Sequence, residues 1–410
     1  MSRITLPTDR IREKYHAVLQ RIRSVHLKCF PGCPDPLFLI SDAYPGVWLE
    51  HVYDAIRWAE LAPRDAQVAA AQVRLFLDRQ KPDGQFPCYV LDISNPHAAG
   101  YAASVGYGQI QECVSFTQLC LEAALLTNDD ALLREAYDKC VRWDAWLCSH
   151  RMTLGSGLIE LFCEYDTGHD NSPRFSDIPK GCPHGDARNC PDLPFLPLRA
   201  PDMNAVFYGS RMALSRMAAR LGRRDEEQLW RERAAQVRDA LFRICFDPED
   251  LFFYDADRSG HHRKFRSILL ANLFQEHLLD GDLAERIYQR YMKNPQEFWA
   301  PFPFPSMSLS DPHAVQNLDG NSWGFYSQGL TALRALRWMD HYGKSEDLEE
   351  LMRRWIFAFV RQDEIPFGQE LHPVSGRPSV SSRWYSSSML FFVSAVRRLQ
   401  LLSPQEYHPL

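Results

Sequence analysis

The sequence predicts an all-α protein, because three features of the chain agree. Apolar residues recur at helical spacing in most segments, alternation of the β-strand type is scarce, and turn residues divide the helical segments into pairs. With 410 residues, 45% of them hydrophobic and 24% charged, the chain has a globular composition and can bury a large core. One large helical domain spanning residues 1–410 is therefore expected.

The helices of the N-terminal half are expected to stop at turn residues. Pro63 helps to end the second helix, Pro82-Asp83-Gly84 stops the third, and Thr127-Asn128-Asp129-Asp130 separates the next two. In chain order, the expected helices of this half span residues 8–27, 46–62, 65–80, 108–127 and 130–149.

Turn residues also separate the expected helices of the C-terminal half. Gly222, Asp280-Gly281-Asp282 and Gly343 each lie between two helical segments. In chain order, the expected helices of this half span residues 202–221, 224–245, 262–277, 281–292, 321–342, 345–361 and 380–402.

These segments form six helical hairpins if the first helix pairs with the last. Short turns join the helices of a hairpin and longer loops separate the hairpins, so the two kinds of connection are expected at opposite rims. Ring closure buries the apolar face of every helix, which predicts an (α/α)6 barrel with six inner and six outer helices. An open helical solenoid is the alternative, and the lack of a fixed repeat period counts against it.

Three long loops, 83–107, 151–200 and 293–320, are expected on the rim that carries the functional site. The loop 151–200 is the longest of them and is read as an insertion.

Composition excludes several classes of function. The formal net charge is -6 and no Lys/Arg-rich stripe stands out, which argues against a nucleic-acid partner. No apolar run reaches the roughly 18 residues of a membrane helix, and the N-terminus lacks the apolar core of a signal peptide, so a cytoplasmic protein is expected. The sequence does not indicate the oligomeric state.

The eleven cysteines are scattered, and most are expected to be buried thiols. Two groups, Cys29 with Cys33 and Cys182 with His184 and Cys190, match no zinc spacing, so no metal is expected. No phosphate-binding loop, Ser/His/Asp order or H-E-x-x-H motif occurs, and no cofactor is expected.

The loop 164–175 carries the densest chemistry in the chain, with acids, an arginine, an asparagine and aromatic residues. Hydrolysis of a glycosidic bond needs a carboxylic acid that protonates the leaving oxygen, and Asp170 is the candidate. An Asx-turn leading into Pro173 is the alternative reading of this aspartate.

The segment Asp166-Thr-Gly-His-Asp170-Asn-Ser-Pro-Arg174 resembles the E-[ST]-G-x-D-x-[SY]-x-R motif of glycoside hydrolase family 63 and the related trehalases. The resemblance implies that Asp170 is the general acid and that Arg174 lies in the sugar-binding site. Asp166 stands where the family has Glu, which suggests a changed substrate contact. His169 stands where the family often has Trp and is a candidate hydrogen-bond donor to the sugar.

A second segment, Phe367-Gly-Gln-Glu370-Leu-His-Pro373-Val-Ser-Gly376, resembles the C-terminal E-x-(x)-[YF]-[DN]-P-x-[TS]-G segment of the same families. The resemblance implies that Glu370 activates water as the general base and that the anomeric centre is inverted. The spacing from Glu to Pro is one residue shorter than in the common form, and Glu364 is the reserve candidate.

Shorter segments that resemble motifs of these families follow in the same order along the chain. Tyr44-Pro-Gly-Val-Trp48-Leu-Glu50-His51 stands at their first aromatic-acidic motif, Pro201-Asp202-Met-Asn204 resembles the opening of an inner helix, and Asp319-Gly-Asn321-Ser-Trp323 replaces their Gly-Pro-x-Trp segment. Each tryptophan is as readily a core residue as a stacking surface for a sugar. The predicted substrate-binding residues are Arg174, Asp166, His169, Trp48, Glu50, Gln109, Asn321, Trp323, Trp384 and Tyr385.

The resemblance thus implies an inverting glycoside hydrolase that cleaves an α-glucoside or a related short oligosaccharide or disaccharide, with a small carbohydrate as its expected partner. Two alternatives use the same barrel. One is a sugar 2-epimerase or isomerase, which works with histidine pairs, and the other is a carbohydrate-binding barrel without catalytic activity.

Overall fold

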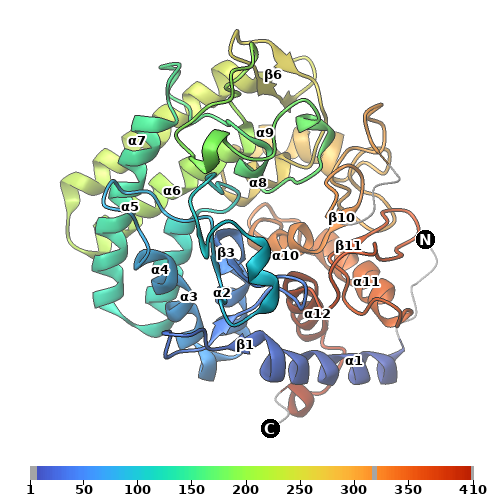
Figure 1. Ribbon diagram of the computed structural model, residues 1–410. Coiled ribbons are helices and arrows are strands. Elements are labelled where there is room, and N and C mark those ends of the chain that lie inside the picture. Colours follow the sequence, from blue (N-terminus) through green and yellow to red (C-terminus); the bar gives the residue numbers. More distant parts are fainter. Residues whose placement is uncertain (1–6, 316–320, 408–410) are drawn as a thin grey trace. The chain divides into compact units, whose positions relative to one another are not determined.

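The computed structural model describes residues 7–315 and 321–407, and helices dominate it (Figure 1). The α-helices are α1 (Thr8–Arg21), α2 (Val52–Leu61), α3 (Gln67–Leu77), α4 (Phe116–Thr127), α5 (Asp130–His150), α6 (Pro201–Arg220), α7 (Arg224–Cys245), α8 (Leu270–Gln275), α9 (Gly281–Ile287), α10 (Gly329–Trp338), α11 (Ser345–Val360) and α12 (Ser386–Arg398).

The strands that the structure describes are two or three residues long. They are β1 (Leu27–Lys28), β2 (Leu37–Phe38), β3 (Gly46–Trp48), β4 (Tyr89–Leu91), β5 (Val105–Gly106), β6 (Phe246–Asp247), β7 (Phe252–Phe253), β8 (Asp255–Ala256), β9 (His262–Arg263), β10 (Ser327–Gln328) and β11 (Glu370–Leu371). In the described parts of the chain, no helix combines the length and the apolar character needed to cross a membrane.

The chain folds into two compact units. Unit 2 consists of Cys29–Phe38 and Pro45–Asp280 and contains α2 to α8, whereas unit 1 contains α1, the short segment Leu39–Tyr44 and the chain from α9 onward.

Unit 2 is built from helical hairpins, in which α2 packs on α3, α4 on α5, and α6 on α7 (Figure 1). Asn128 adopts the left-handed conformation (φ 51°) that turns the chain between α4 and α5. The Asp129 side chain then accepts the backbone N–H of Leu132 and caps α5. Because α4 also contacts α2 and α6, neighbouring hairpins bury one another's apolar faces, as the periodicity predicts.

A small antiparallel sheet, β3–β4–β5, joins the entrance of α2 to the loop 83–107. In its register Trp48 lies opposite Tyr89, and Tyr89 lies opposite Gly106. A Cβ atom at Gly106 would meet the Tyr89 ring at 2.2 Å, so only glycine fits under that ring. The sheet therefore holds Trp48 against aromatic residues of a predicted functional loop.

In unit 1, α12 is the central helix and contacts α1, α10 and α11. Its buried residues run without interruption from Ser386 to Val396, so it has no solvent-facing side over that stretch. The strands β10 and β11 pair antiparallel and place Gln328 directly opposite Glu370. The predicted general base thus lies at the entrance of α10.

Several predicted helices begin later than the periodicity indicated. The segment 108–127 becomes helical only at α4, 321–342 only at α10, 380–402 only at α12, and 46–62 enters as β3. The segment 262–277 keeps only the short α8 and begins as β9. At two of these entrances, distant carboxylates take the backbone N–H groups: Asp166 accepts from Ile110, and Glu370 accepts from Ser322.

Two of the long loops are described completely and the third in part. The loop 83–107 contains β4 and β5, and the loop 151–200 consists of turns and short 3-10 segments. Residues 316–320 of the loop 293–320 lie outside the described residues.

Candidate active site

Arg174 is the centre of a buried charge cluster in unit 2. Its Nε and Nη2 atoms donate to Asp255 at 2.9 and 2.6 Å, and its Nη1 and Nη2 atoms donate to Asp202 at 2.7 and 3.2 Å. A fifth bond joins Nη1 to His169 Nδ1 at 3.0 Å. These bonds use all five N–H groups of a guanidinium, so a sugar hydroxyl could bond Arg174 only after one of them opens.

The electrostatics of this cluster follow from its burial. Burial alone opposes the charged form of each group, yet the two carboxylates together raise the pKa of Arg174 above its ordinary value. Burial is likewise outweighed by Arg174 at Asp202, whose pKa is lowered, whereas burial prevails at Asp255, whose pKa is raised. Because one arginine faces two aspartates, the charged form of Asp255 is less stabilised than that of Asp202.

His169 obtains a defined tautomer from its contact with Arg174. An arginine N–H can only donate, so Nδ1 of His169 accepts this bond and the ring proton of the neutral imidazole lies on Nε2. The ring is 4% exposed, and Nδ1 lies 3.5 Å from Asp202. The predicted role of His169 as a donor to a sugar hydroxyl therefore falls to its Nε2–H.

Asp166 joins three backbone segments of unit 2. Its carboxylate accepts two bonds from Arg151, at 2.6 and 3.2 Å, and the backbone N–H groups of Ile110, Phe162 and Cys163 at 2.9, 2.9 and 3.2 Å. Both Asp166 and Arg151 are 0% exposed. Asp166 thus contacts protein on all sides, and a sugar contact at this position requires a rearrangement of these bonds.

Two thiols adjoin this ion pair, and the sulfur atoms of Cys163 and Cys182 lie 3.5 Å apart. With the Asp166 carboxylate they could surround a metal ion. Arg151 already occupies this environment, since its guanidinium contacts Asp166 at 2.6 Å and Cys182 at 3.6 Å. A metal ion would meet a buried like charge there, so these residues fit an arginine rather than a metal.

Asp170 is half-buried on the same loop, between the 3-10 turns Glu164–Asp166 and Pro173–Phe175. Asn171 follows it in the left-handed conformation (φ 58°), and its backbone N–H donates to Glu164 at 2.6 Å. Burial and the nearby Asp170 and Glu164 charges raise the pKa of Tyr165 to about 12, so its phenol stays protonated near neutrality. Asp170 therefore lies on a turn that a backbone hydrogen bond holds in place, near the phenol of Tyr165.

Glu50 lies against the same loop at Gly168, which has a φ of 70°. A Cβ atom at Gly168 would stand 3.2 Å from the Glu50 carboxylate and 3.3 Å from the Cys113 sulfur. Cys113 in turn donates to Glu50 at 3.3 Å. Gln109 is half-buried and directly precedes Ile110, which binds Asp166. The structure thus brings Glu50 and Gln109 to the loop that carries Asp170.

Trp48 belongs to an aromatic cluster with two tyrosines of the loop 83–107. Its ring centroid lies 5.4 Å from that of Tyr89 and 5.9 Å from that of Tyr101. Tyr101 also acts electrostatically on Tyr165, so this cluster adjoins the surroundings of Asp170. Trp48 is half-buried and Tyr101 is exposed, which leaves aromatic surface for a sugar face.

Glu370 is fixed by hydrogen bonds in unit 1. Its Oε1 atom accepts the backbone N–H of Ser322 at 2.5 Å and the Gln328 amide at 3.0 Å. Its Oε2 atom accepts from the hydroxyl of Ser381 at 3.4 Å, and Ser379 donates to the same carboxylate. Burial raises the pKa of Glu370 above its ordinary value, while these hydrogen bonds act in the opposite direction.

The two candidate bases differ in burial. Glu364 is exposed at the surface of unit 1, whereas Glu370 is 0% exposed and oriented by four donors. A general base must hold its lone pairs in one direction, and Glu370 is the candidate of the two that has such a scaffold.

The other predicted substrate-binding residues of unit 1 differ in the exposure of their side chains. Trp323 and Tyr385 are buried, at 3% and 1% exposure, and leave little ring surface for a sugar. Trp384 is half-buried, with φ of 50°, and its ring centroid lies 5.5 Å from that of Phe367. Asn321 accepts from the Gln369 amide at 2.8 Å.

Sequence reasoning missed the partners of the charged residues. Asp255 lies in the short strand run Phe252-Phe-Tyr-Asp-Ala, where a single acid among aromatic residues was the only signal. Arg151 follows α5 and carries no motif. Asp202 was part of a motif, yet its bond to Arg174 could not be inferred from it.

Glu112 is a further buried acid of unit 2, and its Oε1 atom accepts from Trp143 Nε1 at 2.8 Å. Burial, aided by Asp144 and Glu276, raises its pKa to about 8 from 4.5. Below pH 4.5 this carboxyl is protonated in both the folded and the unfolded state and does not lower the free energy of unfolding. As the pH rises from 4.5 toward 8, the unfolded state loses its proton first, and the free energy of unfolding falls progressively.

We therefore expect Glu112→Gln to stabilise the protein by about 2 kcal/mol at pH 8 and to leave its stability unchanged at pH 4. Urea unfolding at both pH values measures this difference, with exposed Glu346→Gln as the control. An equal effect of Glu112→Gln on the free energy of unfolding at both pH values would contradict the raised pKa of Glu112.

Comparison with known proteins identifies the fold. The fold matches a GH63 mannosylglycerate hydrolase from Thermus thermophilus in complex with Tris, with a TM-score of 0.72 and 17% identity over 94% of this chain and 100% of that chain. It also matches neutral trehalase Nth1 from Saccharomyces cerevisiae, with a TM-score of 0.62 and 11% identity over 93% and 77% of the two chains. The predicted (α/α)6 barrel fold is thereby confirmed.

The profile described as "Mannosylglycerate hydrolase MGH1-like glycoside hydrolase domain" matches residues 44–388, so the chain belongs to this glycoside hydrolase family. A curated relative, an uncharacterized protein of Borreliella burgdorferi, is 21% identical over 170 residues, which cover 41% of this chain and 35% of that protein. The predicted resemblance to family 63 and its trehalase-like neighbours is confirmed, and the fold and family together support glycosidase activity.

Proposed function

We propose that this chain is an inverting glycoside hydrolase in which Asp170 protonates the leaving oxygen and Glu370 activates water. The observation that carries the proposal is the buried Glu370 carboxylate, whose Oε1 atom is saturated by Ser322 and Gln328. Its Oε2 atom accepts from the Ser381 hydroxyl at a long distance of 3.4 Å. A water molecule that replaces the Ser381 hydroxyl would be held for attack.

On the acid side, the proposal uses the loop around Asp170. Arg174, Asp202 and His169 form a rigid support, and His169 presents Nε2–H as the donor to a sugar hydroxyl. Arg174 then acts as a positioning residue, since its five N–H groups already bond to protein atoms. Trp48 supplies an aromatic face for the ring of the substrate.

The proposed substrate is a short α-glycoside, either an α-glucoside as the resemblance implies or a glycoside of a small hydroxy acid such as mannosylglycerate, after which the family is described. Sugar release from mannosylglycerate, glucosylglycerate, trehalose, and aryl α- and β-glycosides tests this proposal, and NMR of the first product anomer tests inversion. Turnover that survives Glu370→Gln, or product of retained configuration, would overturn the mechanism. No turnover of any of these compounds would favour the non-catalytic barrel.

A pH profile provides a separate prediction. Because burial raises the pKa of Glu370, the acidic limb of kcat/KM should lie above the ordinary glutamate value of 4.5. Ser379 donates to the charged form of Glu370, so Ser379→Ala should move this limb to still higher pH. The buried Ser394, which bonds a helix carbonyl of α12, provides the control Ser394→Ala. An acidic limb that does not move in Ser379→Ala would argue against Glu370 as the base.

A further inference from the structure

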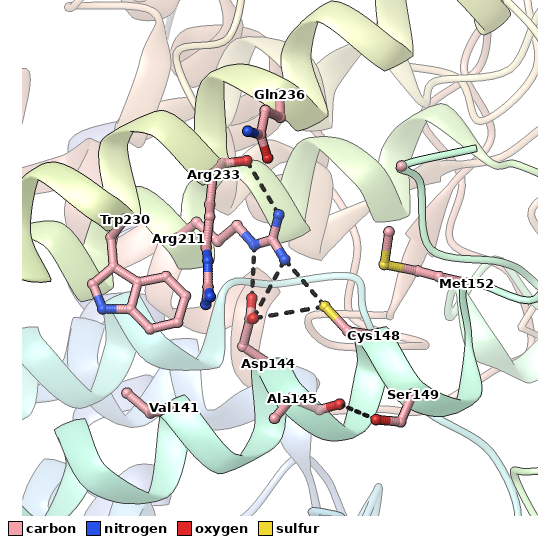
Figure 2. A pocket seen from close by; sticks show the side chains of 11 residues that line it. Val141, Asp144, Ala145, Cys148, Ser149, Met152, Arg211, Trp230, Arg233 and Gln236 are labelled. Atoms are coloured by element: carbon pink, nitrogen blue, oxygen red, sulfur yellow. Dashed lines mark hydrogen bonds and ion pairs between the residues drawn. The ribbon is translucent and has the colours of Figure 1, made fainter. Parts of the chain in front are cut away.

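A cavity of about 480 Å³ lies among three helices of unit 2, outside the cluster of Asp170 and Arg174. Figure 2 shows Asp144, Cys148 and Ser149 of α5 on one side of it and Trp230, Arg233 and Gln236 of α7 on the other. This volume falls within the range of about 300–1,000 Å³ that is typical of small-molecule sites. Ser149 and Gln236 are exposed, so the cavity opens to solvent.

The charges around the cavity do not cancel. Arg211 and Asp144 form a buried ion pair of 2.7 Å and neutralise each other. Arg211 also donates to the Cys148 sulfur at 3.1 Å. Burial and Asp144 raise the pKa of Cys148 to about 11, so this thiol is neutral near pH 7. One cation, Arg233, therefore remains among the lining residues.

Arg233 is half-buried, and in the described residues it has no carboxylate partner. Its guanidinium lies 4.8 Å from the centroid of the Trp230 ring, while its backbone oxygen accepts from Arg211 at 3.1 Å. The Trp230 N–H donates to the Tyr137 hydroxyl at 2.9 Å, so this N–H is not available to a ligand. A guanidinium over an aromatic ring and without a counter-ion is suited to bind an anion.

The lining residues also restrict the kind of anion. Arg233 is the one cation of the lining without a carboxylate partner among the described residues, so it matches a ligand with a single negative charge. Gln236 and Ser149 offer polar groups at the opening, and Val141 and Met152 supply apolar walls. In a hydroxylated carbon chain, the hydroxyl groups can hydrogen-bond the polar groups at the opening, and the carbon atoms can pack against the apolar walls.

We propose that this cavity is a second binding site that takes a hydroxylated monocarboxylate of the size of a sugar acid, with its carboxylate on Arg233. The site is lined by α5, α6 and α7 together with Met152 and Gly157 of the following loop. None of the residues proposed for hydrolysis belongs to it, so it does not depend on the proposed hydrolysis.

Isothermal titration calorimetry of the full chain with sodium gluconate tests the proposal, with glucose and inorganic phosphate as comparison probes. We expect gluconate to bind with a Kd of about 1 mM or below and Arg233→Met to weaken it at least about tenfold. Arg224→Met, on the same helix but outside the cavity, should leave the affinity unchanged. Glucose should show no dependence on Arg233.

Three results would overturn this site. They are gluconate binding that Arg233→Met leaves unchanged, no gluconate binding at all, and an Arg233-dependent preference for phosphate over gluconate. Circular dichroism and urea unfolding of Arg233→Met report whether the variant folds, and Gln236→Ala, at an exposed position, gives a second and smaller loss of affinity.

Discussion

Asp170→Asn is expected to reduce kcat/KM by about 10²–10⁴-fold for a substrate with an alcohol leaving group. Asparagine keeps the shape of the side chain but cannot deliver a proton to the glycosidic oxygen. An aryl glycoside with an acidic phenol as leaving group needs little protonation and should lose much less activity. The ratio of the two losses, measured by steady-state kinetics, therefore reports on acid catalysis rather than on folding.

The matched control for this experiment lies in the same loop. Asp177 is exposed and pairs with Arg263 at 2.6 Å, so Asp177→Asn changes the same chemical group without touching the proposed acid. We expect it to retain nearly full activity. Equal losses for both leaving groups in Asp170→Asn, or a loss below tenfold, would reject Asp170 as the general acid.

Arg174→Met is expected to lower the free energy of unfolding by about 3–5 kcal/mol at pH 7, because it leaves two buried carboxylates without their cation. Asp202 and Asp255 are 2% and 1% exposed, so water cannot replace the lost hydrogen bonds. In the variant, burial and mutual repulsion must raise the pKa of both groups. The folded state then binds protons more tightly than the unfolded state, and the loss should shrink as the pH falls toward 5.

Urea unfolding at pH 7 and pH 5 measures this effect. Arg188→Met is the control, because Arg188 pairs with Asp186 in the same loop but is half exposed, and such pairs contribute about 0–1 kcal/mol. Adding Asp202→Asn and Asp255→Asn to Arg174→Met removes both stranded charges and should restore part of the stability. A loss below about 1 kcal/mol at pH 7 would show that the cluster does not stabilise the fold.

The helical architecture was readable from the chain wherever apolar spacing alone governs the structure. The predicted helices 224–245 and 130–149 agree with α7 and α5 within a residue at each end, because each lays an apolar face on a neighbouring hairpin. The predictions failed at helix entrances that border the candidate site. At two of these entrances a backbone N–H bonds a carboxylate from another segment, which periodicity cannot reveal.

The candidate residues show the same division. The motif in 166–174 identified Asp166 and Arg174 as special, but it suggested contacts with a sugar. In the structure, Asp166 bonds Arg151, and Arg174 bonds Asp255, which lies 81 positions away along the chain. Burial of a charge is tolerated only with a partner, and such partners follow no local spacing.

From the chain alone came the helical class, the acid-rich loop and the pair of carboxyl candidates, since periodicity and short motifs are local properties. Folding determined which charged groups are saturated by protein atoms, which tautomer His169 adopts, and that Arg233 finds no counter-ion among the described residues. These properties depend on exclusion of water and on partners from distant segments, and both arise only when the helices pack.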